Sequence, residues 1–416
     1  MNGLLRNISW LALGNALAKP VWLFFIVVVC VRELGEEGYG IFTATLALAA
    51  IARSLTDFGI TPYSIREVAR RQAHASRYLS NFLSIKVGLS LLALGGSLVV
   101  GGALGYAGGK FMALVFAAAY TMALGLTDYF RAYFRAFEQM QYEAVSVVVE
   151  KGLVVGGGVV FLVMYETAAA VLGGMTLGMF ATLLLNLWWT TTRFAAIKTA
   201  LLSPTFLKRA LPAAIPLGLA GQFVVIYFRT DAVMVDAMVS TAAAGQYGEA
   251  YRLLEAVTMI TALVTAAIYP RLSSLFKDKR RAEFTRIFSR SALSVTGIGL
   301  AVAVGLFVFA APLMRLLTGG EVFAPAAEAL KILAWAAPFM AINYVLSVTL
   351  NASDDQNRLA WVLGGAALFN VALNFVVIPL YSFYGACAST LATEALITML
   401  LGLRYLRHTR FLMANG

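Results

Sequence analysis

The sequence contains few charged residues, few cysteines and few histidines. Only 13% of the 416 residues are Asp, Glu, Lys or Arg, whereas 60% are apolar. A soluble domain carries about one quarter charged residues, so this composition excludes an ordinary soluble protein and indicates an integral membrane protein. Cys30 and Cys387 both lie inside apolar runs, which argues against a disulfide framework. The two histidines are far apart in the sequence, so the sequence predicts no metal site.

The sequence also lacks a long polar segment. The longest polar loops, near residues 193–212 and 270–290, have about 20 residues each, too few for a folded domain. The only Gly-Lys pair is Gly109-Lys110; it is followed by Phe111 and lacks the upstream glycine of a phosphate-binding loop. Transport driven by ATP bound to this chain is therefore excluded, and no other cofactor is expected.

Long apolar runs dominate the chain instead. A helix needs roughly 20 apolar residues to cross a hydrocarbon core about 30 Å thick. Twelve runs meet this requirement, near residues 10–31, 39–60, 79–101, 111–131, 145–164, 168–192, 213–236, 241–269, 291–315, 329–351, 358–378 and 383–405. The predicted fold is all-α: a polytopic membrane protein with twelve transmembrane helices.

The basic residues are distributed unequally over the loops. One set of alternate loops carries most of the Lys and Arg residues, and this assignment places Lys86 and Arg131 in loops. The other set contains Arg32, Lys110, Arg315 and Lys331. Because cytoplasmic loops are enriched in Lys and Arg, both termini are predicted to be cytoplasmic. The net charge of +11 then reflects topology and contact with anionic lipid headgroups, not nucleic acid.

The two halves of the chain resemble each other at an offset of 208 residues. At this offset GYG at Gly38 to Gly40 aligns with QYG at Gln246 to Gly248, and Pro62 aligns with Pro270. Each proline ends an apolar run and begins a basic loop. Two repeats that each have an even number of helices keep the same orientation in the membrane. We therefore predict two six-helix lobes, residues 1–200 and 201–416, with a substrate path between them.

Five basic residues lie inside the apolar runs: Lys19, Arg53, Lys151, Arg229 and Arg252. Each would cost about 2.5–3.5 kcal/mol at the centre of a lipid-facing helix. These side chains are therefore expected to face protein or water.

Acidic residues accompany these cations in the second half. Glu249, Arg252 and Glu255 recur every three residues and so share one side of a helix. Asp231 and Asp236 follow Arg229, and a purely structural network of ion pairs between two helices explains them equally well. Glu394 is the lone acid of the last run; it is either a protonatable coupling site or an acid neutralised by burial.

Several stripes of polar residues occur at four-residue spacing in the last three runs. Interhelical hydrogen bonding explains such stripes, and lining of a substrate path is the alternative. The stripes are Asn343, Ser347 and Asn351, then Asn370 and Asn374, then Ser389 and Thr393.

Seven segments in order along the chain carry a resemblance to a known family. They are ELGEEGYGIF, LTDFGITPYSIREVARR, DYFRAYFRAFEQMQYEA, IYFRTDAVMV, GQYGEAYRLLEA, IYPRLSSLF and NVALNFVVIPLYSFYGACAST. With them the chain resembles the polysaccharide-transporter (oligosaccharide flippase) branch of the multidrug/oligosaccharidyl-lipid/polysaccharide exporter superfamily, whose members have two six-helix lobes around a central cavity.

The resemblance implies that a polyprenyl-pyrophosphate-linked oligosaccharide moves from the cytoplasmic to the outer leaflet of the cell membrane by alternating access. Cations in a low-dielectric cavity would balance the pyrophosphate charge, and we expect Lys19, Arg53, Arg229 and Arg252 to provide them. Coupling to Na⁺ or H⁺ would involve four acids, namely Asp231, Glu249, Glu255 and Glu394. Anionic lipids and glycan polymerases or glycosyltransferases are the expected partners.

Two alternatives remain open. A Na⁺- or H⁺-coupled exporter of small molecules is the nearest neighbour in the superfamily and would have a cavity dominated by acids. A membrane-embedded glycan polymerase or ligase would be expected to have a large external loop with catalytic Arg or His, whereas the external loops here are short and contain no His. An enzyme is therefore not predicted.

Overall fold

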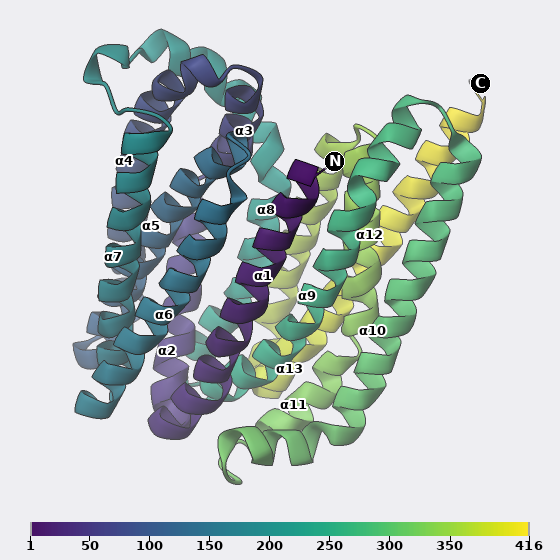
Figure 1. Cartoon of the computed structure of the whole chain (residues 1–416). Helices are drawn as coiled ribbons and strands as arrows, with labels where there is room; N and C mark the ends of the chain where they lie inside the picture. The colour runs from purple at the N-terminus through teal and green to yellow at the C-terminus, as the bar shows by residue number, and fades with distance from the viewer. Residues whose placement is uncertain (1, 415–416) are drawn as a thin grey trace. The chain divides into compact units, whose positions relative to one another are not determined.

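The computed structural model describes the backbone of residues 2–414 and the side chains of residues 9–10, 13–216, 218–255, 261, 264–265 and 268–407. This part of the chain is helical and contains no β-strand, which confirms the predicted all-α class. The elements (Figure 1) are α1 (Asn2–Phe24), the π-helix η1 (Phe25–Cys30), α2 (Val31–Ser54), α3 (Ile60–Arg70), η2 (Gln72–His74), α4 (Ala75–Ala103), α5 (Gly108–Ala136), α6 (Met140–Tyr165), α7 (Ala168–Arg193), η3 (Thr199–Leu201), α8 (Pro204–Met238), α9 (Thr241–Lys277), α10 (Arg281–Thr318), α11 (Ala324–Ala334), α12 (Ala337–Ala352) and α13 (Gln356–Ala414).

Eight helical segments of the described residues are long and apolar enough to cross a membrane. The number rises to nine if α11 and α12, which meet at 46°, form one bent span. Two segments, Leu13–Ser54 and Gln356–Arg407, have 42 and 52 residues, roughly twice the length that one crossing requires. Each contains one residue with a non-helical backbone, Gly35 (φ 64°) and Ser382 (φ 56°). The chain is thus a multi-pass membrane protein, and the count of twelve spans stays a prediction.

The chain divides into two compact units, residues 1–225 and 226–416. The division falls inside α8, so the first part of this helix belongs to unit 1. The predicted lobe boundary after residue 200 stays a prediction.

In unit 1 the helices pack in pairs, and the contact of α6 with α7 is especially close. A Cβ atom on Gly157 would lie 2.3 Å from the carbonyl oxygen of Gly174, and one on Gly174 would lie 2.1 Å from that of Gly157. Only glycine allows the two backbones to approach this closely, as at many interfaces between membrane helices.

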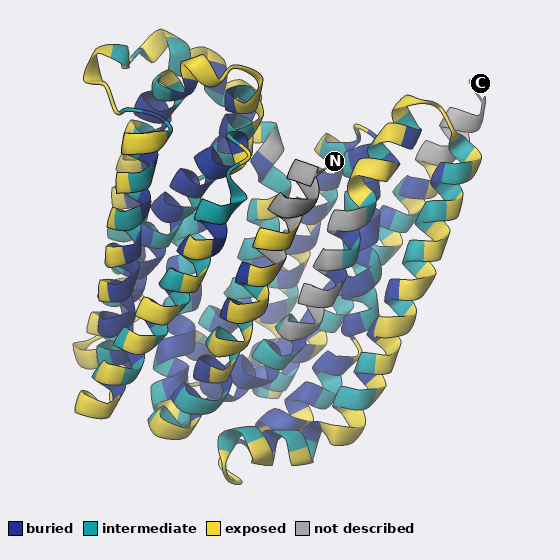
Figure 2. Cartoon of the chain, viewed as in Figure 1, coloured by how far each residue is buried: buried dark blue, intermediate teal, exposed yellow. Residues whose placement is uncertain are grey.

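The outer faces of several helices expose large apolar side chains. In unit 1, Leu92 and Val99 on α4 are each 73% exposed and Val163 on α6 is 75% exposed, whereas other residues of the same helices are buried (Figure 2). An apolar exposed face over a buried face is what a helix in contact with lipid requires.

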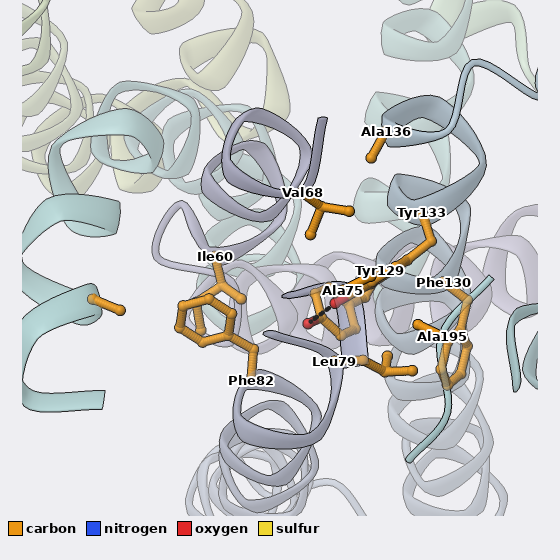
Figure 3. Packing of buried hydrophobic residues seen from close by; sticks show 11 residues of the cluster. Ile60, Val68, Ala75, Leu79, Phe82, Tyr129, Phe130, Tyr133, Ala136 and Ala195 are labelled. Carbon is orange, nitrogen blue, oxygen red and sulfur yellow. Dashed lines mark hydrogen bonds between the residues drawn. The ribbon is translucent and has the colours of Figure 1, made fainter. Parts of the chain in front are cut away.

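One end of unit 1 contains a cluster of buried aromatic residues (Figure 3). Phe82 of α4 and Tyr129 and Tyr133 of α5 belong to it, and the two tyrosine hydroxyls lie 3.0 Å apart. Phe206 of α8 packs against Phe82 with ring centroids 5.6 Å apart. This contact anchors the start of α8 in unit 1.

The core of unit 2 is formed mainly by α9 to α13. Val295 of α10 and Ala341 and Val345 of α12 are buried together, with Ile268 of α9 packed against them. Buried polar side chains lie among these and other apolar ones, and they include Asp231, Asn374 and Glu394.

Candidate functional site

A chain of ion pairs crosses the interior of unit 1. Arg53 at the end of α2 lies 3.7 Å from Asp128 of α5, measured from Nη1 to Oδ2. On α5, Arg131 lies 3.7 Å from the same carboxylate and 2.7 Å from Glu150 of α6. Lys151 lies 2.6 Å from Glu150 and completes the chain. Two of these five groups, Arg53 and Lys151, were expected to be costly in lipid, and mutual pairing lowers that cost.

Neutral groups extend this chain to α7. The buried Arg131 donates from Nε to the hydroxyl of Ser146 at 2.9 Å, and Ser146 donates to the amide oxygen of Asn186 at the same distance. Arg53 differs from Arg131, because about 30% of its side chain is exposed and its buried Nε has no hydrogen-bond partner within the described residues. Arg53 therefore keeps a free donor at Nε, the atom through which Arg131 binds Ser146.

Lys19 lies on α1 and is half-buried. It takes no part in the chain of ion pairs. Its predicted role with Arg53 is therefore not supported by a shared contact and stays a prediction.

In unit 2 two of the predicted cations meet on one carboxylate. Arg229 of α8 lies 2.7 Å from Glu255 of α9, and Arg252 lies 3.1 Å from the other oxygen of Glu255. All three side chains are between 16% and 27% exposed. Two guanidinium groups thus share one carboxylate in a partly desolvated place, where charges interact strongly.

Asp231 lies two residues after Arg229 on α8 but has a different environment. Its buried carboxylate accepts hydrogen bonds from Tyr247 of α9 at 2.9 Å, and from Asn374 at 2.6 Å and Thr390 at 2.7 Å in α13. All three donors are neutral groups. An ion pair between the two helices is present, but it joins Arg229 to Glu255 and does not include Asp231.

Glu394 of α13 is a second buried carboxylate held by neutral donors. It accepts from the Tyr227 hydroxyl at 3.0 Å and from the Asn343 amide of α12 at 2.8 Å. Thr398 donates to the oxygen of the same amide at 2.8 Å, which fixes its orientation. Glu249 of α9 and Asp236 of α8 are buried as well.

The polar stripes of the last helices form hydrogen bonds between segments. Asn370 donates to Ser389 and Thr393 across the break at Ser382, and Asn374 donates to Asn370 as well as to Asp231. These contacts confirm that the residues form hydrogen bonds between helical segments.

A family model described as polysaccharide biosynthesis protein matches residues 4–276, and a model described as MatE matches residues 216–376. The first match covers more than half of the chain.

The chain belongs to the polysaccharide biosynthesis protein family.

Solved structures agree with this family member in fold. The chain is similar to an inward-facing multidrug resistance MATE family transporter, with 15% identity, 99% of each chain covered and a TM-score of 0.79. It is also similar to the lipid II flippase MurJ in an inward closed conformation, with 14% identity, 96% of this chain and 87% of that chain covered, and a TM-score of 0.72. No curated protein matches it.

Two interior cations of this family member escape detection from the sequence. The loop assignment of Lys86 and Arg131 is wrong: both are buried, on α4 and α5. Lys86 lies 2.5 Å from Asp57 and 5.4 Å from the ring centroid of Tyr129. The carboxylate nearest to each, Asp57 and Glu150, is 29 and 19 positions away, and the average hydropathy along the chain cannot show such pairs.

Asp57 sits in the turn between α2 and α3. Burial raises the pKa of its carboxyl, but the charge of Lys86 and hydrogen bonds from Lys86 and Thr61 outweigh burial, so the pKa lies below its ordinary value of 3.8. The turn is therefore held by an ionised carboxylate at neutral pH.

Proposed function

We propose that this protein is a flippase that moves a polyprenyl-pyrophosphate-linked oligosaccharide from the cytoplasmic to the outer leaflet by alternating access. The observation that carries the proposal is the gathering of two cations, Arg229 and Arg252, on Glu255 inside unit 2. Family membership over residues 4–276 supports the same class of substrate.

The cations have a clear physical task in this proposal. A pyrophosphate cannot cross hydrocarbon without a counter-charge, and charge-assisted hydrogen bonds from guanidinium groups are strong in a desolvated site. The residues proposed to bind the pyrophosphate are Lys19 and Arg53, with its unpartnered Nε, in unit 1, and Arg229 and Arg252 in unit 2. Anionic lipids bind the basic loops, and a glycan polymerase or glycosyltransferase cooperates with the protein, which itself carries out no chemical step.

Twelve spans with cytoplasmic termini in the cell membrane fit this function. Leu13–Ser54 and Gln356–Arg407 then each cross twice, and α11 with α12 crosses once as a bent span. The 37-residue helix α9 is long enough for one further crossing.

A flipping assay tests the proposal directly. The full chain is reconstituted in liposomes with a defined fluorescent polyprenyl-pyrophosphate-linked oligosaccharide, and the fraction that reaches the opposite leaflet is measured. Ala variants of Lys19, Arg53, Arg229 and Arg252 should lower the rate at least about tenfold, which corresponds to loss of roughly one charge-assisted hydrogen bond.

The matched control is Arg66→Ala, which removes an exposed arginine paired with Glu67 and should keep the wild-type rate. Normal flipping by all four variants would reject the binding role. Absence of flipping by the wild-type protein with every lipid-linked sugar tried would reject the function itself.

A Na⁺- or H⁺-coupled exporter of small molecules is the second candidate, and the environment of Asp231 and Glu394 favours ion coupling. Both carboxylates are buried among neutral donors, so binding of H⁺ or Na⁺ would offset their charge. Glu249 and Glu255 are further candidates for coupling. The experiment compares transport with and without a Na⁺ or H⁺ gradient.

If coupling is present, Asp231→Asn and Glu394→Gln should remove the response to the gradient while transport down the substrate gradient remains. Uptake of organic cations into vesicles without flipping of lipid-linked sugars would favour the second candidate over the first.

A further inference from the structure

A hollow of about 490 Å³ opens at one end of unit 1. It lies where the chain passes from α3 to α4, from α5 to α6 and from α7 towards η3. Its size is within the range of small-molecule sites, about 300–1,000 Å³. Six side chains line it: Gln72, Phe137, Gln139, Tyr142, Arg193 and Phe194.

The aromatic side of the hollow is rigid. Tyr142 meets Phe194 edge to face, with centroids 5.3 Å apart and planes at 89°, and meets Trp189 at 5.2 Å. Phe137 meets Phe194 at 5.4 Å. Both phenylalanines also pack against the buried cluster of Figure 3. Edge-to-face contacts of this kind hold rings in one arrangement, so the hollow is a preformed feature and not a gap between loose loops.

The polar side of the hollow is rich in donors. Nη1 of Arg193 donates to the Tyr142 hydroxyl at 3.1 Å, which leaves most of the five guanidinium N–H groups to face a ligand. Gln139 accepts from Gln141 through its side-chain oxygen, so its NH₂ group keeps two donors. Gln72 and Arg193 are exposed, and the six lining residues include no acid.

We propose that this hollow binds the sugar portion of the lipid-linked oligosaccharide before translocation, with an acidic sugar placed at Arg193. The inference rests on the proposed flippase function. A pyranose ring has an apolar C–H face that packs on aromatic rings and a rim of hydroxyls that amides recognise. Tyr142 and Phe194 supply the rings, Gln72 and Gln139 supply the amides, and a guanidinium group pairs with the carboxylate of a hexuronic acid.

Other ligands fit the hollow less well. A pyrophosphate would need more counter-charge than the single cation Arg193 provides. A lipid tail would not satisfy two glutamines and an arginine, and desolvating these groups without partners would oppose binding. Under the proposed topology this end of unit 1 faces the cytoplasm, where the sugar portion is assembled.

Binding is measured first, with the full chain in lipid nanodiscs and ligand-observed NMR. The probes are a panel of soluble oligosaccharides that contain neutral hexoses, N-acetylhexosamines or hexuronic acids, and each acidic member is paired with its carboxyl-reduced form. We expect an acidic member to bind, and its affinity to fall about tenfold on carboxyl reduction, in Arg193→Gln and in Gln72→Ala.

The matched control is Arg70→Gln, which changes an exposed arginine outside the hollow and should leave the affinity unchanged. Tyr142→Phe removes only the hydroxyl that orients Arg193 and tests the site if other variants fold poorly. Binding of no member of the panel, equal loss in Arg70→Gln, or equal competition by polyprenyl pyrophosphate without sugar would overturn the proposal.

Flipping kinetics separate the two proposals. In liposomes Arg193→Gln should raise the KM for the lipid-linked oligosaccharide about tenfold and keep the maximal rate, since the hollow acts in loading. Normal wild-type flipping with an unchanged KM in the variants would reject sugar binding at the hollow and would support the flippase function. Sugar binding at the hollow without wild-type flipping would reject the flippase function and would support the sugar-binding site.

Discussion

Interior charged side chains in this protein are stabilised in two ways, by ion pairs and by neutral hydrogen-bond donors. In unit 1, cations and carboxylates alternate from Arg53 to Lys151, so each buried charge has a partner of opposite sign. In unit 2, Asp231 and Glu394 are surrounded by hydroxyl and amide donors instead. Ion pairs fix a structure firmly, whereas a carboxylate among neutral donors can gain or lose a cation with less rearrangement.

The shared carboxylate Glu255 should stabilise unit 2. Glu255→Gln removes the carboxylate charge that Arg229 and Arg252 share, and we expect the free energy of unfolding to fall by about 1–3 kcal/mol, since the group is partly exposed. Thermal unfolding in detergent at fixed pH measures this.

Glu321→Gln, which affects only the exposed pair with Arg315, serves as the control and should change stability by less than about 1 kcal/mol. Equal effects of the two variants would contradict the assigned role of Glu255.

Asp57 should make stability depend on pH. Its pKa is lower in the folded state than the ordinary 3.8, because Lys86 and Thr61 outweigh burial. The contribution of the ion pair is therefore fully present above pH 3.8 and is lost as pH falls through the folded pKa. The gap in Tm between wild type and Asp57→Asn should be wide at neutral pH and should narrow in acid.

Glu328→Gln, on the exposed pair with Lys331, should show no such trend. A Tm gap for Asp57→Asn that stays constant down to strongly acidic pH would mean that Asp57 acts through shape and not through charge.

At the scale of elements, α8 is held to unit 1 by a close approach of backbones. Gly59 at the start of α3 has φ +78°, and a Cβ atom there would lie 2.1 Å from the carbonyl oxygen of Ala214. A Cβ atom on Gly218 would lie 2.2 Å from the amide nitrogen of Gly59. The first part of α8 thus packs directly against the turn between α2 and α3, which the Asp57–Lys86 ion pair stabilises.

Gly218→Ala should therefore force α8 away from this turn and lower the free energy of unfolding by about 1–3 kcal/mol. Gly221→Ala, one turn later on α8, has nothing within 4 Å of the added carbon and should be neutral or slightly stabilising, since alanine favours a helix. Thermal unfolding of the two variants compares them directly, and the reverse order of stability would disprove the contact.

At the scale of the whole molecule, the proposed topology assigns alternate turns to opposite sides of the membrane. Single cysteines replace Ala107, Val239, Ala200 and Lys279 in a chain without Cys30 and Cys387. An impermeant maleimide added to intact cells should label positions 107 and 239, and should label 200 and 279 only after the membrane is opened. Labelling of position 200 or 279 in intact cells would reverse or reject the twelve-span topology.

The amino-acid sequence by itself determined the class of the protein, because apolar runs of bilayer length and scarce charge leave little alternative to membrane helices. It also identified Arg229, Arg252 and Glu255 as interior charges, since helical spacing is local and regular. It failed for Lys86 and Arg131, whose nearest carboxylates, Asp57 and Glu150, are distant along the chain.

Only the tertiary structure decided which groups meet. The Tyr227 hydroxyl reaches Glu394 over 167 positions, and Thr390 reaches Asp231 over 159. The hollow at Arg193 joins three turns that are separate in the sequence. Pairing energies depend on distance and on the local dielectric, and both are set when helices pack, not by the order of the residues.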